Sequence, residues 1–85
     1  MENNKFLKKK IIYRSKHRGS KEMDLLLGSF VNKYVDSFSK KELLELNNLL
    51  NTEDEIIYNW YFDRSIKAKF PVNRVTEKFK KFKVY

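Results

Sequence analysis

The chain has 85 residues, of which 41% are hydrophobic and 15% aromatic, so it can form one small globular domain. It contains no cysteine and a single histidine, which excludes a disulfide framework and argues against a transition-metal site and Cys–His catalysis. The net charge is +8 and is unevenly spread, because residues 1–21 and 64–85 are strongly basic and residues 22–63 are acidic.

The first predicted helix covers residues 4–17. Leu7 and Ile11 begin an apolar row at helical spacing that Arg18 ends. Gly19 follows, and a glycine in this place supplies the positive φ with which many helices end. We therefore expect the chain to turn at Arg18 and Gly19.

The second predicted helix covers residues 20–37, with Ser20 as its N-cap. Gly28 lies in its middle and costs about 1 kcal/mol relative to alanine, so we expect another helix or a partner to approach the backbone there. Glu22 and Leu25 begin a second row that points away from the core. The core stripe itself consists of Met23, Leu26, Leu27, Phe30, Val31 and Tyr34.

Two capping boxes are predicted in the middle of the chain. Ser39 and Glu42 start a third helix, whose leucines at 43, 46 and 50 face inward. Thr52 and Glu55 start a fourth helix over residues 53–64. This fourth helix is apolar nearly all round, so we expect it to be the central one. We assign its aromatic residues to the core rather than to a base-stacking platform; they are Tyr58, Trp60, Tyr61 and Phe62.

The last predicted helix covers residues 73–83 and begins at the cap Asn73, after a loop that contains Pro71. Its inner row is Val72, Val75, Phe79 and Phe82, and its outer face is Arg74, Lys78, Lys80 and Lys81. The fold class is therefore all-α: a compact five-helix bundle in one domain, residues 1–85, with residues 1–4 and 84–85 frayed. The sequence shows neither a secretory signal nor a membrane span, so we expect a protein of the bacterial cytoplasm.

The stretch RGSKE, residues 18–22, lies at the tip of the hairpin formed by the first two helices and has two interpretations. In the first, Gly19 ends one helix, Glu22 faces the N-terminal dipole of the next, and Arg18 caps carbonyl groups. In the second, Arg18 and Glu22 form an exposed pair, and the arginine forks onto a carboxylate or carbonyl group of a partner. Composition alone leaves both open.

The basic segments suggest a competing function. Lysines 8–10, Arg14 and Lys16 on the first helix could act with the C-terminal lysines as a small nucleic-acid-binding surface. Alternatively, the basic ends neutralise the acidic middle of the chain and the excess charge keeps it soluble. The sequence contains neither a nucleophile–base–orienter set nor a Gly-rich phosphate loop, so we do not expect an enzyme.

Taken whole, the chain resembles the SdhE family of FAD assembly factors, the flavinylation factors of succinate dehydrogenase. The resemblance rests on Arg18–Gly19–x–x–Glu22, which matches the RGxxE signature of that family, and covers roughly residues 5–70. The further matches are Tyr13, the segment 23–27 with Phe30, the leucine-rich segment 42–50, and DEIIYNW at 54–60.

The resemblance implies an assembly factor that binds the flavoprotein subunit of succinate dehydrogenase or fumarate reductase and promotes covalent attachment of FAD to a histidine of that subunit. FAD is then the cofactor of the client, the chemistry resides in the client, and this chain holds no cofactor stably. We expect the chain to be a monomer that neither binds nucleic acid nor inserts into a membrane. The predicted partner-binding residues are Arg18, Gly19, Glu22, Asp24, Tyr13, Phe30 and Trp60.

Overall fold

The computed structural model describes residues 3–63 and 65–84. These residues form five α-helices, a single turn of 3-10 helix and the loops between them, and contain no strand. The predicted all-α, five-helix fold is confirmed. The elements are α1 (Asn3–Ser15), α2 (Lys21–Tyr34), the 3-10 turn η1 (Val35–Ser37), α3 (Lys40–Leu50), α4 (Asp54–Phe62) and α5 (Arg74–Lys81).

The boundaries differ slightly from those predicted. The predicted second helix ends early as an α-helix, because the chain tightens into η1 after Tyr34. α4 ends at Phe62, and Arg64, with which the predicted fourth helix ends, lies outside the described residues. Of the predicted frayed ends, residues 1–2 and 85 also lie outside the described residues, whereas α1 already begins at Asn3.

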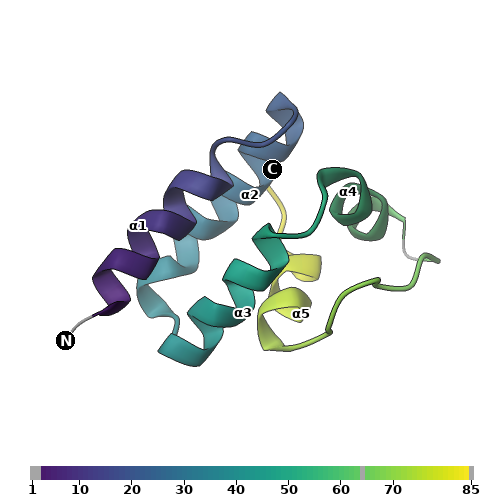
Figure 1. Ribbon diagram of the computed structural model, residues 1–85. Helices are drawn as coiled ribbons and strands as arrows, with labels where there is room; N and C mark the ends of the chain where they lie inside the picture. Colours follow the sequence, from purple (N-terminus) through teal and green to yellow (C-terminus); the bar gives the residue numbers. More distant parts are fainter. Residues whose placement is uncertain (1–2, 64, 85) are drawn as a thin grey trace.

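α1 and α2 run side by side as an antiparallel hairpin, α3 lies against α1, and α5 packs against α3 (Figure 1). The core lies between these helices, with the fully buried rings of Phe30 and Phe79 in edge-to-face contact, 5.1 Å between centroids. The predicted inward leucines of α3 are all buried. The hairpin therefore rests on a packed layer, which holds the turn between α1 and α2 in place.

The prediction that the fourth helix is central is wrong. α4 lies at one end of the molecule, beside α5 (Figure 1), and only Ile57 and Trp60 of its residues are buried. These two residues are three apart and define one inward stripe, while Tyr58 and Phe62 lie on the exposed side. The assignment of the aromatic cluster to the core is thus confirmed for Trp60, holds in part for Tyr61, and is wrong for Tyr58 and Phe62.

Three helices begin as predicted and one does not. The Ser20 hydroxyl accepts a bond from the Met23 N–H, Ser39 and Glu42 form a reciprocal capping box, and Asn73 caps α5. The predicted box at Thr52 is absent: α4 has Glu53 at its N-cap position, without a side-chain cap bond. The Thr52 hydroxyl instead points back to the Asn48 carbonyl of α3.

The two glycines behave differently from one another. Gly19 has a negative φ, so the predicted left-handed helix end is wrong. α1 instead ends where the Ser15 hydroxyl donates to the Ile12 carbonyl and the Lys16 N–H donates to the Tyr13 carbonyl. Gly28 is buried against the end of α1, and this confirms that another helix approaches the backbone there.

The faces of α5 also need correction. Val75 and Phe79 are buried as predicted, but Val72 precedes the helix and is exposed. Lys80, predicted on the outer face, turns inward: its ammonium group donates to the carbonyls of Trp60 and Tyr61 and lies 4.6 Å from the centre of the Trp60 indole. A long lysine stem can follow apolar surface in this way.

Candidate functional site

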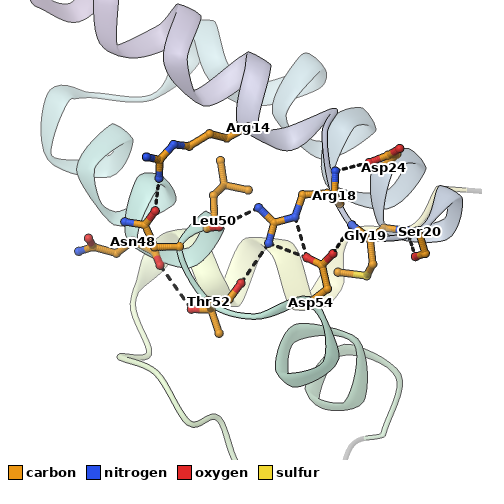
Figure 2. Close-up of polar contacts among 11 residues, drawn as sticks. Arg14, Arg18, Gly19, Ser20, Asp24, Asn48, Leu50, Thr52 and Asp54 are labelled. Carbon is orange, nitrogen blue, oxygen red and sulfur yellow. Dashed lines mark hydrogen bonds and ion pairs between the residues drawn. The ribbon is translucent and has the colours of Figure 1, made fainter.

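Arg18 is the centre of the junction between α1 and α2 (Figure 2). Its Nε and one terminal nitrogen bond the Oδ1 of Asp54 at 2.7 and 2.6 Å. The two terminal nitrogens also donate to the carbonyls of Leu50 at 2.7 Å and Thr52 at 3.0 Å. Only 9% of the Arg18 side chain is exposed. The arginine therefore ties the α1–α2 loop to the turn between α3 and α4.

Asp54 completes this connection from the other side. Its Oδ2 accepts the Gly19 N–H at 2.6 Å, so one carboxylate holds both the side chain of Arg18 and the backbone of the next residue. Asp54 is the first residue of α4, where the helix dipole favours a negative charge. A Cβ on Gly19 would lie 3.1 Å from the same oxygen, so glycine allows the loop to approach Asp54 closely.

A second carboxylate fixes the loop on the side of α2. The Oδ1 of Asp24 accepts the Arg18 N–H at 2.6 Å (Figure 2). Two successive backbone N–H groups, of Arg18 and Gly19, are thus each bound by an aspartate from a different helix. We call Arg18, Gly19, Asp24 and Asp54 the junction cluster. Its effect is to hold residues 18–20 in one conformation at the surface.

The predicted exposed pair of Arg18 and Glu22 is wrong. The guanidinium group points inward, because the carboxylate of Asp54, the last carbonyl of α3 and the Thr52 carbonyl of the following turn offer it more acceptors than a surface glutamate would. Glu22 is exposed in the first turn of α2, and no hydrogen bond or ion pair joins its side chain to another described residue. The two charged residues of the signature therefore face in opposite directions.

The remaining predicted site residues fall into two groups. Tyr13 is 63% exposed, and its ring stacks on His17 with centroids 4.0 Å apart, so it is accessible beside the junction. Phe30 has no exposed surface and Trp60 is buried against Phe70 and Lys80. The prediction of direct partner contact is corrected for Phe30, because a fully buried ring supports the surface only from beneath.

Sequence reasoning missed Asp54 as a member of the site. The available signal was the acidic start of the segment DEIIYNW, whose first residue is this aspartate. We interpreted Glu55 as part of a capping box and Asp54 only as part of a segment that resembles the family, since sequence separation hides the contact between residues 18 and 54.

The described residues offer neither a group of three side chains that could hold a metal ion nor a helix that could span a membrane. The strongest polar contacts of the junction are used within the chain itself. The arrangement holds a rigid turn at the surface of the molecule.

Residues 9–83 match the protein family described as flavinator of succinate dehydrogenase. The chain is 40% identical over 74 residues to a protein of Dictyostelium discoideum named succinate dehydrogenase assembly factor 2, mitochondrial, a match that covers 87% of this chain and 50% of that relative. It is 33% identical over 57 residues to a protein of Acetobacter pasteurianus named FAD assembly factor SdhE, covering 67% of this chain and 52% of the relative.

A third relative, the succinate dehydrogenase assembly factor 2 of Scheffersomyces stipitis, is 45% identical over 51 residues, or 60% of this chain and 34% of the relative. The chain thus spans about half the length, or less, of the curated relatives it matches. No solved structure matches it. These matches do not favour the nucleic-acid alternative. Because the family match extends over most of its length, the chain belongs to the family of flavinators of succinate dehydrogenase.

Proposed function

We propose that this chain is a FAD assembly factor that binds the flavoprotein subunit of succinate dehydrogenase and promotes the covalent attachment of FAD to a histidine of that subunit. The observation that carries the proposal is the family match over residues 9–83, which includes the complete signature at the α1–α2 junction. Fumarate reductase, if the cell contains it, offers a flavoprotein subunit of the same kind as a second client.

The junction cluster supports this proposal by its rigidity. Arg18 and Asp54 form a hydrogen-bonded ion pair inside the molecule. The residues between α1 and α2 are therefore held in one conformation and need no rearrangement before a client binds them. The turn presents outward the exposed backbone of Gly19 and the carboxylate of Glu22, which pairs with no other residue that the structure describes. A preformed surface loses little conformational entropy when a partner binds, so more of the contact energy is kept as affinity.

The assembly factor acts by selecting a conformation of its client. Binding stabilises the arrangement of the flavoprotein subunit in which the flavin and the acceptor histidine are close and aligned. The bond itself forms between groups that the client provides. This chain has no cysteine, and its single histidine, His17, is engaged with the Tyr13 carbonyl and ring.

Two further points belong to the proposal. The chain acts as a monomer that binds one client, and it takes up no FAD of its own. The relatives named above include both bacterial and mitochondrial proteins, so the bacterial cytoplasm predicted from the sequence is one of two compartments that they allow.

The test is to co-express the flavoprotein subunit with wild-type chain, with Glu22→Gln, and with the matched control Glu77→Gln. Both glutamates are exposed in the first turn of a helix, but only Glu22 belongs to the signature. Covalent flavin is measured as fluorescence of the denatured subunit in a gel. We expect wild type and Glu77→Gln to raise the signal and Glu22→Gln to lose most of that gain. A wild-type chain that leaves covalent flavin unchanged would falsify the proposal.

A further inference from the structure

A groove of about 340 Å³ opens beside the signature, between α2, the end of α4 and the segment that follows α5. Glu22 and Leu25 of α2 form one wall, Phe62 of α4 another, and Lys83 and Val84 the third. The chain after α5 runs back toward α2 (Figure 1), which brings this last wall into place. The groove therefore joins parts of the sequence that are about 60 residues apart.

Two apolar side chains that line the groove are exposed. Leu25 is 47% exposed and Phe62 is 58% exposed. Among the described residues, the Phe62 ring pairs with two other rings, Tyr58 and Tyr61, and both belong to its own helix. Two large apolar residues that face one hollow from different helices are typical of a surface that another molecule covers.

The charges around the groove indicate what the other molecule is like. Glu22 offers a carboxylate on the α2 wall, and Lys83 is exposed on the wall of the C-terminal segment. Lys80 also lines the groove, but its ammonium group donates to main-chain carbonyls of α4 and holds the wall together. The groove thus presents an apolar floor between one anionic and one cationic group.

We propose that this groove is the docking site for a segment of the client flavoprotein that inserts a bulky aliphatic or aromatic side chain and flanks it with a basic and an acidic residue. The basic residue pairs with Glu22 and the acidic one with Lys83. The inference rests on the proposed function, because the client is the partner named there. The groove adds a second element of recognition to the signature, because Glu22 then forms one edge of an apolar binding site.

This occupant fits the groove better than a second copy of the chain. A twofold contact would press two identical hollows against one another, so neither copy would fill the groove of the other. A client segment needs only one complementary stretch.

The test measures binding of the purified apo flavoprotein subunit to wild type, Leu25→Ser, Phe62→Ser and the control Leu44→Ser. Leu44 is also 47% exposed, but it lies on α3 and does not line the groove. We expect each groove variant to weaken binding about tenfold or more, which corresponds to 1.4 kcal/mol, and the control to bind like wild type. Lys83→Glu is expected to weaken binding several-fold, with the loss fading at high salt.

The outcomes separate the two proposals. Equal binding by wild type and both groove variants overturns the docking site while leaving the proposed function intact. A wild-type chain that neither binds the subunit nor raises its covalent flavin overturns both. Light scattering identifies the remaining occupant: a dimer of wild type that Leu25→Ser dissociates, with client binding unchanged, would assign the groove to self-association. Circular dichroism checks each variant for folding, and the two groove residues lie on different helices, so either variant suffices.

Discussion

Replacement of Asp54 by alanine tests whether the junction cluster holds the fold together. The change removes the carboxylate that bonds two nitrogens of Arg18 and the N–H of Gly19. A hydrogen bond to a charged group contributes about 1.5–3 kcal/mol, and breaking a buried ion pair costs about 3–5 kcal/mol. Arg18 keeps the carbonyls of Leu50 and Thr52, and Asp54 is itself 26% exposed, so water can replace part of the loss.

We therefore expect Asp54→Ala to lower the free energy of unfolding by about 2–3 kcal/mol. This value lies within the range for a hydrogen bond to a charged group and below the range for breaking a buried ion pair. In a domain of this size each kcal/mol shifts the melting temperature by about 4–8 °C, so the shift should be on the order of 10–20 °C. Urea titration followed by circular dichroism gives the free energy directly.

Glu55→Ala is the matched control, because Glu55 lies in the same first turn of α4 but is exposed. It loses only an interaction with the helix dipole, about 0.3–1 kcal/mol. If Asp54→Ala unfolds within about 0.5 kcal/mol of this control, the junction cluster has no special role in stability and the argument from its hydrogen bonds is wrong.

Two further outcomes are expected. Gly28→Ala should raise the free energy of unfolding by about 0.5–1 kcal/mol, because alanine is the better helix former. A Cβ there would meet Lys16 at an ordinary contact distance of 3.6 Å, so the methyl group should fit. Thermal or urea melts measure the change, and a loss of stability would show that α1 cannot accommodate the methyl group. Burial raises the pKa of the Tyr61 hydroxyl above its usual value, and this hydroxyl donates to the Phe82 carbonyl. The neutral form is thus favoured by folding, so its contribution to stability is complete below pH about 10 and is lost as the pH rises through the folded-state pKa. Urea melts between pH 8 and 11 should show a shallower decline for Tyr61→Phe than for wild type, and parallel declines would contradict this account.

Local patterns in the sequence predicted the helices well because each depends on nearby residues. The core stripe of α2 and the caps Ser20, Ser39 and Asn73 act within a few residues, and all lie where they were predicted. The errors came where one local rule competed with a distant contact. Thr52 has the spacing of a capping residue, yet its carbonyl accepts a bond from Arg18, which is 34 residues away in the chain.

The prediction that α4 is the central helix, which rested on its apolar composition, was wrong for a related reason. Composition says how much apolar surface a helix has, but the position of the helix depends on which neighbours fill the core first. The leucines of α3 and the aromatic residues of α2 and α5 already fill the centre. Phe62 is therefore left on the surface, where it lines the groove beside Glu22.

The signature RGxxE joins two tasks that the fold separates in space. The Arg18 side chain faces inward to Asp54, which also accepts the Gly19 N–H, and these contacts set the path of the chain into α2. Glu22, one turn later, faces outward to solvent and to the groove. Because α2 is a rigid helix that starts at the junction cluster, the position of the Glu22 carboxylate depends on contacts made within the chain. Substitutions at the first two positions should therefore lower stability and client binding together, whereas a change at Glu22 should lower binding alone. The chemical character of each residue alone would not have distinguished these tasks, since an arginine and a glutamate four residues apart form an ordinary helical ion pair in many proteins.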